Sequence, residues 1–209
     1  MYRLHDYLPS GNGYKVRLLL TQLGIPFQRV DHDIECGETR KAPFLAKNPN
    51  GKIPVLELGP GRYLTESNAI LCFLADDTHF LPADRFQRAQ VMQWMFFEQY
   101  DHEPNIAVVR RWVTHKLPMT PFREAALPEK RQRGEAALAL MEQHLAQREW
   151  LVGTGYTIAD IALYAYTHVA PEGGFDLGPY PAIRRWLARV AAEPRHIPIT
   201  DRTAGALAA

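Results

Sequence analysis

The sequence predicts an α/β domain followed by an all-α domain. In the first 80 residues, short apolar stretches alternate with helical segments in the order β-α-β-α-β-β-α. After residue 80 there is no strand signal, and longer segments carry apolar residues at helical spacing. We therefore expect an α/β domain at 1–78, a linker at 79–84 and a helical domain at 85–209.

The first three predicted elements form a strand-helix-strand unit. Tyr2–Tyr7 is a short strand candidate, and residues 9–13 form a loop rich in proline and glycine. A helix follows from about residue 14 to residue 23, with Gly24 as its C-terminal cap. The second strand is Phe27–Asp31. Because a crossover helix joins strands that run in the same direction, these two strands should pair in parallel.

The remainder of the first domain adds a hairpin and two helices. Residues 39–47 are predicted to be helical and short. Val55–Leu58 and Arg62–Thr65 flank the turn sequence Gly-Pro-Gly and therefore predict an antiparallel hairpin. Ser67–Ala75 is the third helix. The sheet should thus combine a parallel pair with an antiparallel edge.

The second half opens with two helical segments. Arg85–Tyr100 is rich in glutamine, methionine and aromatic residues at helical spacing, and Pro104 should interrupt or kink the helix. Residues 125–147 place apolar side chains on one face. The tail, Thr203–Ala209, is expected to be frayed.

A nearly all-apolar helix, residues 158–169, should lie at the centre of the second domain. Thr157 is its predicted N-cap, and Asp160 stands at the third helical position, as in a capping box. Pro181 begins a last, amphipathic helix.

Composition limits the kinds of partner. The chain has 209 residues, 46% of them apolar and 22% charged, with a net charge of +1. Without a basic run, we expect neither nucleic acid nor membrane as a partner. No apolar run is long enough for a bilayer span, and we expect no signal peptide. Cys36 and Cys72 have no zinc-binding spacing, so we expect a cytoplasmic protein without a metal.

The segment Asn48–Pro54 is the most informative loop. Its two prolines and its Asn-Gly pair indicate a turn that feeds a strand. A residue before proline is held extended, so Ile53 should present its backbone N–H and C=O like an unpaired sheet edge. Such an edge could bind a short extended peptide.

Four short motifs carry a family resemblance. In chain order they are Ser10-x-Asn12, Ile53-Pro54, Glu66-Ser67 and Thr157-Ile158-Ala159-Asp160. With the first three, the N-terminal domain resembles a thioredoxin fold. With all four, the whole chain resembles a cytosolic glutathione transferase of the serine type (theta, zeta and bacterial relatives), and Asn12 adds some nu-type character.

The resemblance implies a site for the peptide glutathione. Ile53 would pair its backbone with the cysteinyl unit, and the Ile53–Pro54 bond should be cis. Glu66 would take the ammonium and Ser67, at a helix N-terminus, the γ-glutamyl carboxylate. Lys52 is near enough for the glycyl carboxylate, with Lys41 or Arg40 as second candidates. The alternatives are that Glu66-Ser67 is only a helix cap and that Lys41 is a solvated surface charge.

The chemistry requires a thiolate. A free thiol has a pKa near ~8.5, so its anion needs stabilisation at neutral pH. Ser10 is the first candidate donor and Asn12 the second, and the N-terminus of the first helix adds a field of the right sign. Tyr7, in Tyr-Leu-Pro, is a rival donor, because the sequence also resembles the tyrosine-containing motif of the alpha, mu and pi classes. The structural alternative is that Ser10 simply caps the helix.

The second domain would line the pocket for a hydrophobic electrophile, and a homodimer is expected by resemblance. The candidate pocket residues are Tyr100, Glu103, Trp112, His115 and Tyr164. The expected activity is conjugation of glutathione to the electrophile. One alternative is glutathione-dependent reduction of disulfides or peroxides, which would run through glutathione itself because residues 10–13 lack cysteine. Another is a non-catalytic binding module.

Overall fold

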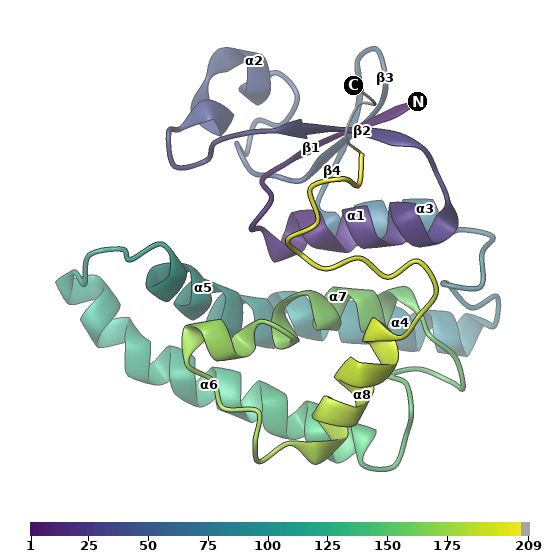
Figure 1. Cartoon of the computed structure of the whole chain (residues 1–209), viewed down its shortest axis with the longest axis vertical. Coiled ribbons are helices and arrows are strands. Elements are labelled where there is room, and N and C mark those ends of the chain that lie inside the picture. The colour runs from purple at the N-terminus through teal and green to yellow at the C-terminus, as the bar shows by residue number, and fades with distance from the viewer. Residues whose placement is uncertain (206–209) are drawn as a thin grey trace. The chain divides into compact units, whose positions relative to one another are not determined.

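In a computed structural model, described here for residues 1–205, the chain forms two compact units (Figure 1). The first comprises Met1–Asp76 together with the C-terminal segment from Glu193, and the second is Asp77–Ala192. The helical unit therefore ends at Ala192, whereas the sequence predicted a helical domain reaching 209. The last four residues of the predicted frayed tail lie outside the described residues.

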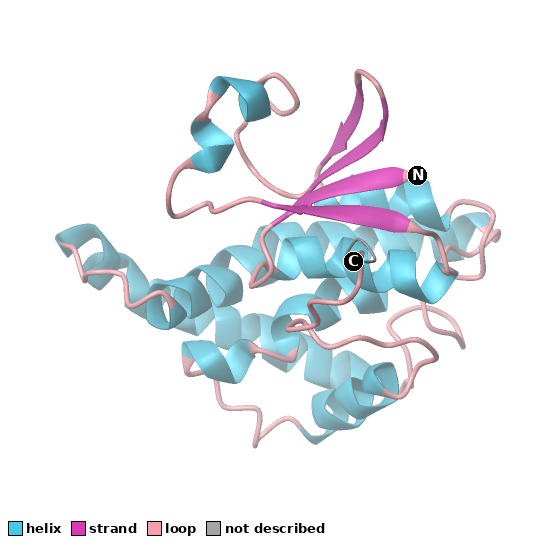
Figure 2. Ribbon diagram, turned by 45° about the horizontal axis from the view of Figure 1, so that its top comes forward, coloured by secondary structure: helices cyan, strands magenta, loops and turns pink. Residues whose placement is uncertain are grey.

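The first unit contains a four-stranded sheet (Figure 2). Its strands are β1 (Tyr2–Asp6), β2 (Phe27–Asp31), β3 (Val55–Gly59) and β4 (Arg62–Thr65). They lie in the order β2-β1-β3-β4. The β1–β2 pair is parallel, while β1–β3 and β3–β4 are antiparallel. The predicted combination of a parallel pair and an antiparallel hairpin is confirmed.

Three helices pack on this sheet. They are α1 (Gly11–Leu23), α2 (Ala42–Leu45), which follows a 3-10 turn at Glu38–Arg40, and α3 (Ser67–Ala75). Helices α1 and α3 lie side by side on one face, and α2 lies on the other (Figure 1). Helix α1 begins three residues earlier than predicted, because the Ser10 side chain caps it by accepting a hydrogen bond from the Gly13 N–H.

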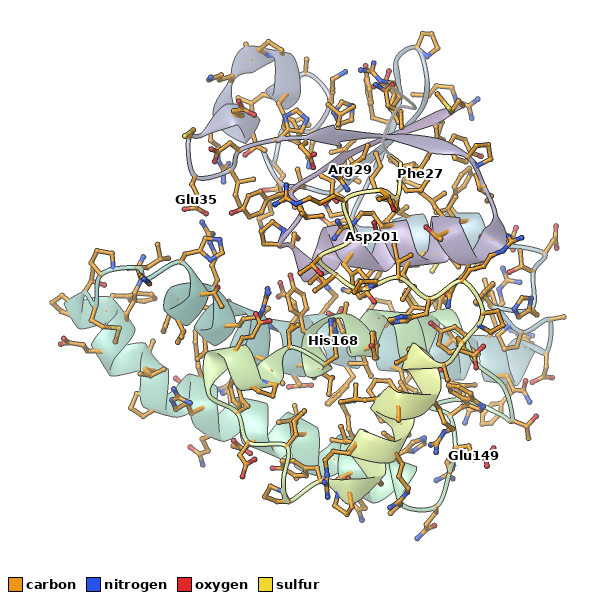
Figure 3. All side chains as sticks on the ribbon, viewed as in Figure 1. Phe27, Arg29, Glu35, Glu149, His168 and Asp201 are labelled. Atoms are coloured by element: carbon orange, nitrogen blue, oxygen red, sulfur yellow. The ribbon has the colours of Figure 1, made fainter. Side chains whose placement is uncertain are left out.

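Within the first unit, the C-terminal segment contacts α1 and β2. The Tyr14 hydroxyl donates to the carbonyl of Ile197 over 2.7 Å. Arg29 donates from its guanidinium to the Asp201 carbonyl over 3.3 Å, and its backbone N–H donates to the Gly205 carbonyl over 2.7 Å (Figure 3). The prediction that the chain frays from Thr203 is therefore wrong for residues 203–205, because the edge strand β2 supplies backbone and side-chain partners.

The second unit is helical. It contains α4 (Arg85–Phe97), a π-helical turn (Glu98–His102), α5 (Glu103–Thr114), α6 (Pro121–Leu145), α7 (Ile158–Thr167), a 3-10 turn (Ala170–Gly173) and α8 (Pro181–Ala191). The predicted interruption near Pro104 takes the form of the π-helical turn that precedes it. This geometry suits proline, which has no N–H to donate to a regular α-helical ladder.

Helix α7 is the core of the second unit, since every residue from Ile158 to Thr167 is buried. Both hydrogen bonds of the capping box between Thr157 and Asp160 are present. The predicted cap and the predicted central position are confirmed. Among the described residues, no helix combines the length and the apolar character that crossing a membrane requires.

Candidate functional site

Three chain segments meet at one end of the sheet in the first unit. The first residue of β3, Val55, is paired with His5 on β1 and with Thr65 on β4. Both neighbouring strands run antiparallel to β3. Consequently, the loop that leaves β1, the segment that enters β3 and the start of α3 converge at this end.

The segment that enters β3 contains the one cis peptide bond of the described chain, between Ile53 and Pro54. This confirms the predicted cis bond. Pro54 is buried, whereas Ile53 is half-buried. The residue before the cis bond is thus accessible at the point where the three segments meet.

The loop before this cis bond is shaped by a buried asparagine. Asn48 is 4% exposed, donates from its side chain to the Lys52 carbonyl over 2.7 Å and accepts from the Asn50 N–H over 3.1 Å. Arg40 donates to the carbonyl of Asn50 over 3.0 Å. Lys41 and Lys52 are both exposed. No pattern in the sequence marked Asn48 as the organiser of this loop.

At the start of α1, Ser10 is half-buried and its Oγ accepts from the Gly13 N–H over 3.3 Å. The structural alternative, a capping serine, therefore holds. Capping occupies a lone pair of the hydroxyl oxygen, and the hydroxyl has a proton of its own to donate. The rival donor Tyr7 is half-buried, and its carbonyl accepts from the Ser10 N–H over 2.8 Å.

The N-termini of α1 and α3 are joined through a buried lysine. Asn12 Oδ1 accepts from Lys15 Nζ over 2.8 Å and from Ser67 Oγ over 3.2 Å. The same ammonium lies 3.4 Å from Ser67 Oγ and 3.4 Å from Asn68 Oδ1. The Lys15 side chain is 0% exposed. A cation and three polar side chains thus connect the two helix ends.

The residue between β4 and α3 has an unusual backbone. Glu66 has φ 66° and ψ 113°, a region that residues other than glycine rarely adopt and that costs about 1–3 kcal/mol. Within the described chain its side chain makes no capping hydrogen bond to α3. Ser67 begins the helix and is 5% exposed. An exposed carboxylate therefore stands beside the positive end of a helix dipole.

The first unit brings most of its predicted site residues to one end of the sheet. They are Ser10, Asn12, Ile53, Pro54, Glu66 and Ser67. The principal residue that sequence reasoning missed is Lys15. The sequence feature that could have revealed Lys15 is a charged residue inside the apolar part of α1, three positions after Asn12.

The pocket residues predicted in the second unit differ in their exposure and in their contacts. Tyr100 is 84% exposed, whereas Tyr164 is 5% exposed and stacks on His168 with ring centroids 4.5 Å apart. Trp112 lies beside the Arg123 guanidinium at 6.0 Å. Glu103 begins α5, and the half-buried His115 shares a 3.0 Å hydrogen bond with Thr114.

A cavity of about 440 Å³ in the second unit has other walls, formed by α4 and by the end of α6. It is lined by Gln93, Trp94, Phe97, Leu140, Gln143, His144, Gln147 and Arg148. This set contains none of the five predicted residues. Among residues 1–205, no group of three or more histidine, cysteine, aspartate or glutamate side chains is arranged to hold a metal ion.

Comparison with known proteins identifies the family. Residues 9–77 match the glutathione S-transferase N-terminal domain and residues 94–194 match the C-terminal domain. A glutathione S-transferase structure from Pseudomonas fluorescens is 53% identical, with a TM-score of 0.92 over 96% of this chain and 99% of that one. The chain belongs to the glutathione S-transferase superfamily, and its first unit is the thioredoxin-like domain of that fold.

Two further relatives bear on chemistry. The disulfide-bond oxidoreductase YfcG of Escherichia coli is 29% identical over 90% of this chain and 89% of its own length. A glutathione transferase family member from Pseudomonas fluorescens, solved with two glutathione molecules bound, is 28% identical. Its TM-score is 0.80 over 93% of this chain and 89% of that chain.

Proposed function

We propose that this protein is a glutathione transferase that binds glutathione at the end of the sheet in its first unit. The observation that carries the proposal is the convergence of the cis Ile53–Pro54 segment with the N-termini of α1 and α3. Family membership and a relative solved with glutathione support it.

In the proposed complex, glutathione lies extended along Ile53, whose backbone pairs with the cysteinyl unit as an added strand. The γ-glutamyl carboxylate is held at the N-terminus of α3 by Ser67, and Glu66 binds the ammonium. Lys52 takes the glycyl carboxylate. Arg40 is a weaker candidate than Lys41 for a second contact, because its guanidinium already donates to Asn50.

The thiol is activated by donors at the N-terminus of α1. Lowering a thiol pKa by about two units requires roughly 2.7 kcal/mol of preference for the anion. A hydrogen bond to a charged group contributes about 1.5–3 kcal/mol, and a helix N-terminus adds about 0.3–1 kcal/mol. The Ser10 hydroxyl or the Asn12 amide, together with the helix, would contribute about 1.8–4 kcal/mol, a range that includes the required amount.

The reaction is a direct consequence of this arrangement. The glutathione thiol loses its proton to solvent, and the thiolate attacks an electrophilic carbon. A carbon–sulfur bond forms while the leaving group, such as a halide, departs with its bonding electrons. The protein binds glutathione and stabilises its anion, and the residues proposed to contact the electrophile are Tyr100, Glu103, Trp112, His115 and Tyr164.

A second candidate function is reduction of small disulfides by glutathione, and the likeness to the oxidoreductase YfcG favours it. The loop at residues 10–13 has no cysteine, so the thiolate of bound glutathione would itself attack a sulfur atom. A mixed disulfide forms and the other sulfur leaves as a thiolate. A second glutathione thiolate then attacks the glutathione sulfur of the mixed disulfide, which releases the remaining substrate sulfur as a thiolate and forms glutathione disulfide.

Parallel assays separate the functions. We expect turnover with a chloro-nitro-aromatic substrate to exceed turnover with a small disulfide at equal glutathione concentration. The reverse ranking favours the reductase. If the protein does not bind glutathione at millimolar concentration, the remaining interpretation is a non-catalytic binding module.

We also propose that the protein is a homodimer. Two large aromatic side chains of the second unit, Phe86 and Phe96, are each 70% exposed. Such exposure is typical of a surface that a second chain covers. Sedimentation equilibrium should give twice the chain mass, 23.8 kDa. A single 23.8 kDa species at micromolar concentration would contradict this.

A further inference from the structure

The Asn12 amide has two chemically different ends, and only one of them helps a thiolate. Its nitrogen donates hydrogen bonds, whereas its oxygen accepts them and would repel an anion. Which end faces the glutathione sulfur therefore decides whether Asn12 activates the thiol. Something in the protein must hold the amide in one orientation.

Lys15 is suited to do this, because an ammonium donates and never accepts. Its Nζ lies 2.8 Å from Asn12 Oδ1, so only the oxygen end of the amide can face it. Ser67 also donates to this oxygen, over 3.2 Å, but a hydroxyl can equally accept from an amide nitrogen. Of these two neighbours, Lys15 alone imposes the orientation.

The burial of Lys15 supports this role. The side chain is 0% exposed, and burying an ammonium is costly compared with burying an apolar chain of similar length. Its Nζ also lies 3.4 Å from Ser67 Oγ, at the start of α3. The same cation thus touches the proposed thiol donor Asn12 and the proposed carboxylate-binding residue Ser67.

We propose that Lys15 is a positioning residue for thiol activation, which holds the Asn12 amide with its nitrogen directed toward the glutathione sulfur. This inference rests on the proposed function, because it requires glutathione in the site. Lys15 does not touch the reacting atoms. It acts through Asn12.

The test is the thiol pKa of bound glutathione, measured from thiolate absorbance against pH in wild-type protein and in Lys15→Met. We expect the substitution to raise this pKa by about one unit, from about 6.5 to about 7.5, which lowers the ionised fraction about threefold at pH 7. Affinity for S-methylglutathione, which has no thiol proton, should change less than about threefold, or ~0.65 kcal/mol. Lys47→Met, which removes a lysine that contacts Tyr63 and Glu57, is the matched control.

A double-mutant cycle distinguishes positioning from a direct charge effect. In the Asn12→Ala background, Lys15→Met should raise the thiol pKa no further, because there is no amide left to orient. If Lys15→Met raises the thiol pKa as much in the Asn12→Ala background as in wild type, Lys15 acts on the thiol through space. That result would overturn the positioning role. If Lys15→Met does not fold, Lys15→Gln replaces it, since a glutamine amide donates and accepts and cannot impose one orientation.

The outcomes separate this inference from the proposed function. If the wild-type protein lowers the thiol pKa and Lys15→Met leaves that pKa unchanged, only the proposed role of Lys15 is overturned. A loss of thermal stability and of S-methylglutathione affinity without a pKa change indicates a structural lysine and also overturns it. A wild-type protein that does not lower the thiol pKa overturns both.

Discussion

Asp6 and Arg17 form a buried ion pair, with Oδ2 of the carboxylate 3.2 Å from Nε of the guanidinium and both side chains 0% exposed. Burial raises the pKa of the Asp6 carboxyl, and the attraction of Arg17 opposes that rise. Arg17 also donates to the Leu8 carbonyl over 2.8 Å and to the Ile199 carbonyl over 3.2 Å. The pair therefore anchors both the loop that leads to Ser10 and the C-terminal segment.

We expect Arg17→Met to destabilise the protein by about 3–5 kcal/mol, because it leaves the Asp6 carboxylate buried without its cation. Asp6→Asn in the Arg17→Met background should recover part of this loss, since no charge then remains at the site. Urea denaturation measures both. If the double variant loses as much stability as the two single variants added together, the residues do not act as a pair.

The same carboxylate leaves no room for a side chain at Gly13. A Cβ built there would lie 1.6 Å from Asp6 Oδ1. Gly13→Ala should therefore displace Asp6 and the start of α1, with a loss of stability above about 2 kcal/mol and weaker glutathione binding. Gly59→Ala is the control, because nothing lies within 4 Å of the added Cβ. Equal melting temperatures for the two variants would disprove the close packing.

Local signals explain why much of the fold could be predicted from sequence. The Gly-Pro-Gly turn between β3 and β4 and the capping box at Thr157 each involve residues close together in the chain. The start of α1 was placed too late because Gly11, Asn12 and Gly13 are poor helix formers, and only the Ser10 cap reveals their conformation.

The features that escaped prediction depend on residues far apart in the sequence. The contact between Lys15 and Ser67 joins positions 52 apart, and no local pattern indicates it. The C-terminal segment has no helical or strand periodicity, yet β2 and Tyr14 hold it in place. The five electrophile-pocket candidates were chosen by residue type, whereas side-chain packing decides whether such residues are exposed or buried.

The capping acid of α7 should be sensitive to replacement by an amide. Asp160 is 0% exposed and accepts four hydrogen bonds, from the Leu151 N–H, the Trp186 indole, and the N–H and hydroxyl of Thr157. An amide has one oxygen, so Asp160→Asn turns an N–H group toward donors. We expect a loss above about 2 kcal/mol by chemical denaturation. A loss under about 0.5 kcal/mol would contradict the importance of the cap.

Asp160 should also make the free energy of unfolding depend on pH. Burial raises the pKa of its carboxyl from 3.8 to about 6. The folded state then binds a proton more tightly than the unfolded state, so this group's stability contribution is lost as the pH rises from about 4 to about 6. Asp160→Asn should remove that dependence, and unfolding free energies measured across this range check it. An unchanged pH profile would exclude Asp160 as its source.

The ring pair of His5 and His32 should make stability depend on pH in the opposite direction to Asp160. His5 Nδ1 lies 2.9 Å from His32 Nε2, and His5 Nε2 lies 2.9 Å from the Glu57 carboxylate. Burial lowers the pKa of both rings. Since the unfolded rings take up protons near pH 6.5, their stability contribution is present above that pH and is lost as the pH falls through their lower folded pKa values.

His32→Gln should therefore reduce the dependence of unfolding free energy on pH below about 6.5, by at most ~1.4 kcal/mol per pH unit for one group. His144 and His196, whose pKa values burial also lowers, remain in both proteins. The comparison with wild type consequently isolates the His5–His32 pair. The exposed His79 provides a control variant, His79→Gln. If the two variants show the same slope, the pair has no special role.

The central claim is that donors at the N-terminus of α1 stabilise a thiolate in the first unit. The most direct measurement is the pH titration of thiolate absorbance for glutathione bound to wild type, Ser10→Ala and Asn12→Ala. We predict a bound thiol pKa about two units below the free value of ~8.5, and a rise of at least about one unit in one or both variants. A bound thiol with the pKa of free glutathione, or a lowered pKa that both substitutions leave unchanged, would contradict the account.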